Sequence, residues 1–216
     1  MITKYGYDVF FTVALICLAV IVLSMLFIEP RVPKYTIVGL SALLFALTVN
    51  FFRDPDRTIP SNEAFVVAPA DGKIVAIRSV DSVEFLGKSA TMISIFMSPL
   101  DVHVNRTPVS GMVKHLRYVK GEYFAAFEDK PSEKNEQMII GIENSHGRFM
   151  FKQIAGFVAR RIVCTLKMDQ QVKAGERFGM IKFGSRVDVF LPSNAAVGVQ
   201  VGQRTVAGET VLAELH

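Results

Sequence analysis

The chain begins with two hydrophobic stretches separated by a short polar link. Twenty uncharged residues run from Val9 to Ile28, which as a helix rising about 1.5 Å per residue would cross the hydrocarbon core of a bilayer. A second uncharged stretch, Tyr35–Phe52, is eighteen residues long and includes small and polar positions, so it either crosses too or lies as a shallower partner. The link contains Pro30 and Pro33, which end one helix and redirect the next. The pattern predicts a transmembrane helical hairpin over residues 1–53.

Charges near the hairpin indicate its orientation. The open end carries Lys4, Arg53 and Arg57, whereas the link carries Arg31 and Lys34. By the positive-inside rule this difference of one charge favours a cell-membrane protein whose main domain faces the cytoplasm. A cleavable signal peptide is the alternative interpretation, but the first stretch is long for that purpose and no small-residue cleavage site separates it from the second.

The pattern changes after residue 53 to short alternating or β-branched runs bounded by turn residues. Few windows keep a helical period. Nine runs are expected to form strands: Phe65–Ala68, Lys73–Val80, Thr91–Met97, Met112–Val119, Gln137–Ile142, Arg148–Ile154, Arg161–Leu166, Phe178–Phe183 and Arg186–Leu191. Strands this short and evenly spaced predict a mainly β domain over residues 54–216, with a hybrid-barrel or sandwich-like fold rather than a parallel α/β sheet.

One internal similarity supports a barrel of repeated units. Val172–Glu176 resembles Thr205–Glu209, and each segment follows one apolar strand and precedes another. Each contains a glycine, the residue that most easily adopts the backbone of a tight turn. Barrels assembled from repeated hairpin units show internal sequence repeats of this kind.

Composition narrows the class of function. Half of the residues are hydrophobic and 20% are charged, which excludes a disordered chain. The net charge is +4, but residues 54–216 hold 20 basic and 18 acidic groups, without a basic stripe, so no nucleic-acid partner is expected. The two cysteines, Cys17 and Cys164, exclude a disulfide framework and a C-x-x-C metal site, and they fit a reducing cytoplasm.

Three segments contain residues with chemical potential. Gly184 and Ser185 fall between two expected strands, and Asp71 precedes a glycine in an expected turn. His103 lies in a segment where apolar and polar residues alternate. Taken singly, each fits an ordinary structural role. Together, a hydroxyl, a base and an orienting carboxylate are the components of an activated nucleophile. The G-x-S-x-G hydrolase signature is absent, and four scattered histidines predict no metal site.

Several motifs occur in an order and spacing that resemble a known family. They are Phe51–Arg57, Ala68–Lys73, Asp101–Arg106, Asn135–Glu136 and Phe178–Arg186. Across essentially its whole length, the chain resembles the short-form phosphatidylserine decarboxylase proenzymes. The resemblance implies a self-cleaving precursor whose cofactor is a pyruvoyl group made from Ser185.

The family's mechanism implies the following chemistry. Ser185 attacks the carbonyl of Gly184, and cleavage gives chains 1–184 and 185–216, which stay together as a heterodimer; higher oligomers remain open. The amine of phosphatidylserine then forms a Schiff base with the pyruvoyl group, CO₂ leaves, and phosphatidylethanolamine is released. Decarboxylation needs an electrophilic ketone to delocalise the carbanion that the departing CO₂ leaves. No standard side chain supplies such a group, so the protein must make it.

The resemblance also implies roles for other residues. Asp71 orients or deprotonates during self-cleavage, and His103 transfers protons near the pyruvoyl group. Arg106 and Arg186 either bind the substrate carboxylate or phosphate or are surface charges beside a strand.

The resemblance further assigns Asn135 and Glu136 to substrate binding. Long-form enzymes carry Leu-Gly-Ser-Thr where this chain has Phe183–Arg186, and a second histidine where it has Arg106. These departures leave open which residue activates Ser185.

Two other functions compete with this interpretation. A membrane-tethered, non-catalytic barrel of the carrier or adaptor type would suit the glycine-punctuated pattern, but it predicts no break at Gly184 and would need an exposed lysine turn. A metallohydrolase on a related barrel would need a His-x-His pair, which the sequence lacks.

Overall fold

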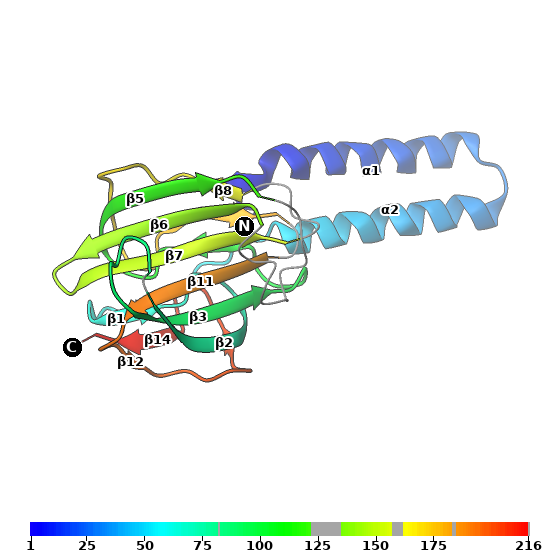
Figure 1. Ribbon diagram of the computed structural model, residues 1–216. Helices are drawn as coiled ribbons and strands as arrows, with labels where there is room; N and C mark the ends of the chain where they lie inside the picture. The colour runs from blue at the N-terminus through cyan, green and yellow to red at the C-terminus, as the bar shows by residue number, and fades with distance from the viewer. Residues whose placement is uncertain (82, 122–134, 157–161, 183–184, 216) are drawn as a thin grey trace. The chain divides into compact units, whose positions relative to one another are not determined.

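A computed structural model describes residues 1–81, 83–121, 135–156, 162–182 and 185–215 (Figure 1). The chain divides into two compact units, Met1–Pro55 and Asp56–His216. The first unit is a pair of apolar helices and the second is almost entirely β. The predicted fold class, a mainly β domain preceded by a helical hairpin, is therefore confirmed.

The hairpin consists of a short 3-10 helix, Lys4–Gly6, followed by α1, Tyr7–Phe27, and α2, Arg31–Phe51. Pro30 caps the start of α2, where a fixed backbone angle and a missing N–H cost nothing. The two ends of the hairpin are joined, because the Thr3 N–H donates to the Phe52 carbonyl at 2.9 Å.

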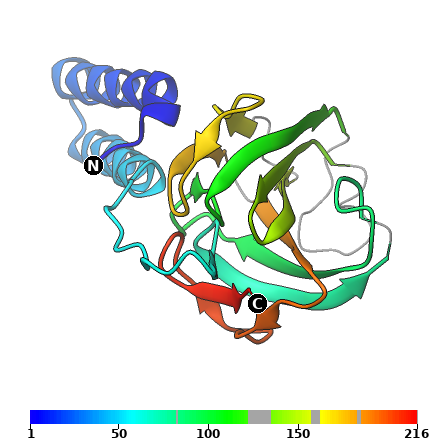
Figure 2. The ribbon, with the colours of Figure 1, turned by 90° about the vertical axis from the view of Figure 1, so that its left-hand side faces the viewer.

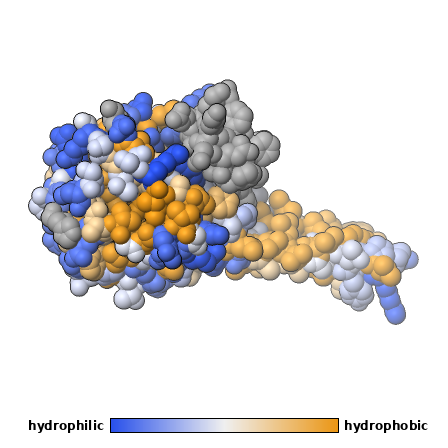
Figure 3. Space-filling model, turned by 60° about the horizontal axis from the view of Figure 1, so that its bottom comes forward, coloured by the Kyte–Doolittle hydropathy of each residue, from blue (hydrophilic) through white to orange (hydrophobic). Residues whose placement is uncertain are grey.

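The helices pack through small side chains and expose large ones. Cys17 and Ser24 on α1 and Ser41 and Thr48 on α2 are buried, which suits close helix contact in a lipid environment. On the face seen in Figure 3 the surface of the hairpin is mostly hydrophobic, and both helices expose large apolar side chains. By length and composition both helices are sufficient to cross a membrane, and this composition indicates membrane association.

The β unit contains one large sheet and two small ones. The eight-stranded antiparallel sheet has the order β13-β2-β3-β11-β7-β6-β5-β9 and curls into an open barrel when viewed along its strands (Figure 2). Three-stranded sheets β1-β14-β12 and β4-β10-β8 complete the unit. The strands are β1 Phe65–Val67, β2 Gly72–Val80, β3 Ala90–Met97, β4 Val104–Arg106, β5 Gly111–Val119, β6 Gln137–Asn144, β7 Gly147–Ala155, β8 Ile162–Cys164, β9 Gln171–Val172, β10 Arg177–Ile181, β11 Ser185–Pro192, β12 Ala196–Val197, β13 Arg204–Thr205 and β14 Val211–Glu214.

The β unit is built from two topologically equivalent halves. Strands β1, β2 and β3 in one half correspond to β4, β5 and β6 in the other, and β2 and β5 have the same length. Both pairs of long strands have a bulge at the same place, β2–β3 after Ile74 and β5–β6 after Val113. The halves exchange backbone bonds, Val67 N–H to Pro108 and Arg106 N–H to Pro69, each at 2.9 Å.

The similarity between residues 172–176 and 205–209 belongs to this duplication. Gly175 and Gly208 both adopt positive φ, 76° and 80°, at equivalent turns. A Cβ on either glycine would overlap Ile59, at 2.4 and 2.7 Å respectively. The similar sequences therefore form two equivalent turns, and both turns pack against the Ile59 side chain.

Strand β11 separates the two faces of the large sheet. Val187, Val189 and Leu191 enter the main hydrophobic core, which also contains Ile93 and Ile95 of β3. The alternate residue Phe190 joins a second cluster on the opposite face. We call these the inner and outer faces of the sheet.

All nine strands expected from the pattern are present in the described part of the chain, with ends shifted by a few residues. The pattern missed β4, β9, β12, β13 and β14, each of two to four residues. Strands this short complete at most two periods of alternation, so long-range pairing, rather than local pattern, defines them.

We expect Gly72→Ala to destabilise the fold by about 1–3 kcal/mol, because a Cβ at this position would lie 2.2 Å from the Phe96 carbonyl oxygen. Gly198→Ala is the matched control, since nothing lies within 4 Å of its added methyl group. Urea unfolding of both variants measures the difference. Equal stabilities would show that β2 and β3 separate easily at this point.

Candidate active site

Ser185 is the first residue of β11 and lies at the centre of the large sheet. It pairs with Met97 of β3 on one side and Ala155 of β7 on the other. Its side chain is on the inner face and completely buried. The hydroxyl donates to the Met97 sulfur at 3.3 Å, and a thioether is a weak acceptor. The nucleophilic oxygen is therefore held in place without a strong bond that an attack would have to break.

Two buried amides lie beside this serine. The Asn105 side chain donates to the Met97 sulfur at 3.7 Å, so Asn105 and Ser185 contact the same atom. Gln153 donates to the Asn105 side-chain oxygen at 2.9 Å. The Gln153 side-chain oxygen has no partner among the described residues although Gln153 is fully buried. The inner face next to Ser185 therefore offers an acceptor that the fold itself does not use.

His103 is also completely buried, just before β4. Its Nδ1 lies 2.9 Å from the carbonyl oxygen of Asp101. Because a carbonyl oxygen only accepts, Nδ1 carries the hydrogen in this contact and Nε2 is the basic nitrogen of the neutral ring. The imidazole is thus in the tautomer that can take up or deliver a proton through Nε2.

Asp71 occupies the turn between β1 and β2. It accepts two bonds from Arg57, at 2.8 and 3.1 Å, and one from the Ala207 N–H at 2.7 Å. Burial raises the pKa of the Asp71 carboxyl, and the Ala207 and Arg57 contacts act in the opposite direction. The nearby charge of Asp101 adds to the increase. A carboxyl whose pKa is raised exchanges protons more readily near neutral pH.

Backbone and side-chain contacts bring the three segments together. The Arg106 N–H donates to the Pro69 carbonyl at 2.9 Å, which joins β4 to the turn that carries Asp71. Asn105 continues the link to Met97 and so to Ser185. Contacts among the described residues do not include a direct hydrogen-bonded chain from Ser185 through His103 to Asp71. The arrangement gathers the three predicted segments around a shared interior rather than forming a serine-hydrolase triad.

Comparison of the two halves isolates the unusual residues. Asn105 of β4 corresponds to Val66 of β1, and His103 corresponds to Ala64, so polar groups in one half replace apolar ones in the other. Buried polar groups cost stability unless they are satisfied, and the first half shows that the fold does not require them. Their presence in one half only is typical of a functional site.

Asp71 shows the same asymmetry. Its counterpart is Ser110, whose hydroxyl accepts from the Ala174 N–H at 2.9 Å, as Asp71 accepts from Ala207. A hydroxyl is therefore enough to cap this turn. The turn itself therefore does not need the negative charge of Asp71 or its ion pair with Arg57.

Asn135 and Glu136 support the strand beside Ser185. The Asn135 side chain donates to the Ala155 carbonyl at 2.8 Å, and the Ala155 N–H donates to the Glu136 carbonyl at 3.0 Å. Ala155 is the β7 partner of Ser185. The Glu136 carboxylate accepts from the Tyr118 hydroxyl at 3.0 Å. Both residues are buried, and they adjoin the site through Ala155.

The side chains of the two predicted arginines make their contacts away from the Ser185 hydroxyl. Arg106 donates to the Gly175 carbonyl at 2.9 Å and lines an open hollow beside the turn of residues 173–177. Arg186 follows Ser185 but points to the outer face, where it forms a bidentate pair with Asp188 at 2.6 and 2.9 Å. Neither arginine shares the inner face with the serine hydroxyl. Gly184 lies outside the described residues.

In the described part of the chain, no three His, Cys, Asp or Glu side chains lie close enough together to hold a metal ion. The two cysteines are free thiols, and burial raises the pKa of Cys164. The candidate site thus consists of a hydroxyl, an imidazole, a carboxylate and two amides.

The sequence model of the phosphatidylserine decarboxylase family matches residues 44–213. The chain belongs to this family, as the sequence motifs predicted, and membership makes it an enzyme of the decarboxylase class. Phosphatidylserine decarboxylase proenzymes of three bacteria illustrate the similarity. That of Pelodictyon phaeoclathratiforme is 50% identical over 99% of each chain, and that of Chlorobium phaeobacteroides is 49% identical over 98% of this chain and 99% of its own. The Prosthecochloris aestuarii proenzyme is 47% identical over 100% of this chain and 98% of its own.

Sequence reasoning missed the residues that connect the site. Asp101 and Asn105 belong to a predicted motif but have no assigned role there, and Met97 and Gln153 fall in expected strands without a functional assignment. Gln153 follows Lys152 in an expected strand, and two adjacent polar residues there are an available signal. Its partner Asn105 is 48 residues away, so only the fold reveals the contact.

We expect Asp71→Ser to be more stable than Asp71→Ala by about 0.5–1.5 kcal/mol, because a serine hydroxyl can replace the bond to Ala207, as Ser110 does in the other half. Both variants lose the ion pair with Arg57, so the difference between their stabilities measures only the hydrogen bond to the Ala207 N–H. Ser110→Ala should cost a similar amount relative to wild type. Urea unfolding provides the measurement, and identical curves for the two Asp71 variants would contradict this account of the turn.

Proposed function

We propose that this protein decarboxylates phosphatidylserine to phosphatidylethanolamine with a pyruvoyl group generated from Ser185. Family membership supports the reaction. The observation that carries the assignment to this residue is the position of Ser185, a buried hydroxyl at the start of β11 among polar groups found in only one half of the fold.

Self-cleavage would begin with attack of the Ser185 Oγ on the Gly184 carbonyl carbon. The peptide C–N bond is replaced by an ester, and the amine of residue 185 is released. Removal of the Ser185 α-proton then expels the Gly184 carboxylate and leaves a dehydroalanine. Hydrolysis of its tautomer by one water gives the pyruvoyl group and ammonia. Only a proton acceptor and water are needed, and His103 and Asp71 are the candidate acceptors.

The sheet explains why the two products would stay together. Residues 185–216 contain β11, β12, β13 and β14. Of these, β11 pairs with β3 and β7, β13 pairs with β2, and β14 pairs with β1. Each of these partners belongs to residues 1–184. The heterodimer is thus expected to have the hydrogen bonds of the precursor.

The residues around Ser185 suit a small electrophilic group at this position. When present, a pyruvoyl group supplies the ketone that draws electrons away from the carbon that loses CO₂. His103 would transfer a proton through Nε2, since Nδ1 is held by Asp101. The Gln153 side-chain oxygen would accept an N–H from the substrate amine, and Asn105 would hold Gln153 in position. Asn135 and Glu136 would act by fixing Ala155 beside the reacting residue.

The hairpin fits a substrate that remains in a bilayer. Its two helices are long and apolar enough to cross one, and a lipid-embedded enzyme would meet its substrate by lateral diffusion. The excess of positive charge at the open end supports a cell-membrane location with the β unit on the cytoplasmic face.

We expect the wild-type protein to yield two chains, residues 1–184 and 185–216, and Ser185→Ala to remain a single chain without activity. Denaturing electrophoresis and intact mass measure the products, and borohydride or hydroxylamine should label the new amino terminus of the smaller chain. Ser79→Ala, an exposed serine on β2, is the matched control and should be cut normally. Full-length wild-type protein with full activity would refute the proposal.

We expect His103→Ala to lower decarboxylation by about 100-fold or more, the usual contribution of a proton-transfer residue. The exposed His146→Ala serves as control. Released CO₂ is measured on cleaved protein whose circular dichroism matches wild type. Normal turnover by a normally cleaved His103→Ala would remove this residue from the mechanism, and failure to cleave would place its role in self-processing.

A further inference from the structure

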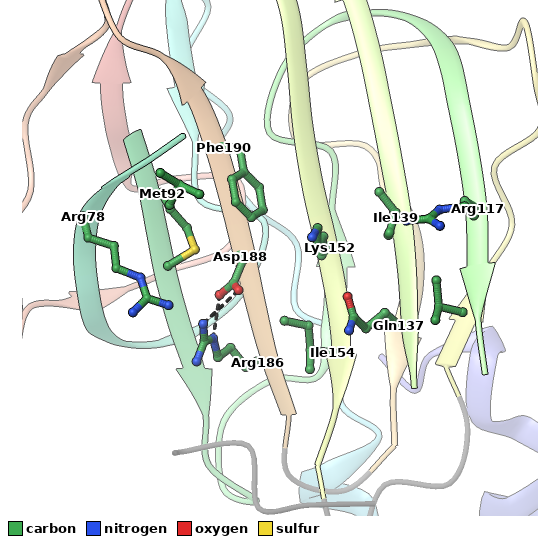
Figure 4. Close-up of a pocket in the computed structure, with 12 residues that line it drawn as sticks. Arg78, Met92, Arg117, Gln137, Ile139, Lys152, Ile154, Arg186, Asp188 and Phe190 are labelled. Carbon is green, nitrogen blue, oxygen red and sulfur yellow. Dashed lines mark hydrogen bonds and ion pairs between the residues drawn. The ribbon is translucent and has the colours of Figure 1, made fainter. Parts of the chain in front are cut away.

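A pocket of about 380 Å³ lies on the outer face of the large sheet, opposite the face that carries the Ser185 hydroxyl. Arg186, Asp188 and Phe190 line it from β11, and Lys152 lines it from β7 (Figure 4). Arg78 of β2 and Arg117 of β5 approach from equivalent positions of the two halves. We propose that this pocket, the outer pocket, binds the phosphate group of an anionic ligand. The proposal does not depend on the chemistry of Ser185.

The charge of the lining is the first argument. Four lining side chains are basic, and Asp188 is the single carboxylate among the described lining residues. Both oxygens of Asp188 bond to Arg186, while Arg117 also contacts Glu84, which is not part of the lining. Positive charges that converge on a recessed space attract anions strongly, because the surrounding protein has a lower dielectric constant than water.

The orientation of Arg186 is the second argument. Its side chain is 2% exposed, and Asp188 binds the Nε and one terminal nitrogen of its guanidinium. The remaining terminal nitrogen, Nη1, forms no bond to a described residue. A guanidinium fixed in this way is preorganised, and its free edge has the planar geometry that matches phosphate oxygens. In the close-up, the head groups of Arg78 and Arg186 lie on the same side of the pocket (Figure 4).

The rest of the lining indicates the shape of the ligand. Met92, Ile139 and Phe190 form an apolar wall beside the charged groups. The Lys152 ammonium lies over the Phe190 ring, 5.1 Å from its centroid. A ligand with a phosphate and an adjoining less polar part fits both regions. A phospholipid headgroup and a free phosphate compound share the chemistry that the basic residues recognise.

The test is a calorimetric titration of the full-length Ser185→Ala protein in detergent, which separates binding from turnover. The probes are inorganic phosphate, glycerophosphoserine and monomeric dihexanoylphosphatidylglycerol. We expect saturable binding of at least one probe, weakened about tenfold by Lys152→Gln and by Arg117→Gln, since each removes a charge-assisted hydrogen bond. Arg148→Gln is the control, because Arg148 lies on the same strand and face as Lys152 but does not line the pocket.

The three probes distinguish the sources of the phosphate. Tighter binding of the lipid than of the other two would support the outer pocket as a lipid headgroup site, and equal binding would support a site for phosphate alone. The proposal is wrong if no probe binds, or if the pocket variants, with native circular dichroism, bind as well as Arg148→Gln. Failure here would leave self-cleavage at Ser185 unaffected, and an uncut but phosphate-binding protein would refute only the proposed function.

Discussion

The antiparallel pairing of β11 between β3 and β7 is the constraint on which the structure depends. This pairing fixes the Ser185 backbone from both sides and alternates the side chains that follow between two faces. Ser185 and Val187 point into the core, while Arg186 and Asp188 point outward. A shift of one residue in register would exchange these groups and bury Arg186 and Asp188 in the core. The chemistry at the start of the strand is therefore secured by the hydrophobic residues further along it.

The internal duplication explains how a small β unit accommodates a polar interior. One half keeps Ala64 and Val66 where the other has His103 and Asn105. The apolar half and the shared core stabilise the fold, and the polar half bears the cost of buried imidazole and amide groups. That cost is limited by bonds such as that of His103 to Asp101 and of Gln153 to Asn105.

Much of this architecture was predictable from the sequence. The hairpin follows from two uncharged stretches, and nine of the strands follow from alternation and turn residues, because both are local patterns. The motifs identified the family and the segments around Asp71, His103 and Ser185. The partners Met97 and Gln153 were not predictable, because register and bulges bring them to the site from distant strands. The expected strand began at Arg186, whereas β11 begins at Ser185. With Ser185 in the strand, alternation places its side chain and that of Arg186 on opposite faces.

The distribution of β11–β14 has a consequence for folding. These strands come from the last part of the chain, but β11 lies in the centre and β13 at an edge of the large sheet, and β14 lies between β1 and β12 in a small sheet. A chain severed before Ser185 would have to reassemble from two molecules, and the shorter piece has no core of its own. Folding would then be reversible only until the break occurs. Afterwards the native state would persist because it unfolds slowly, and a protein that has once lost its small fragment would not recover it on dilution.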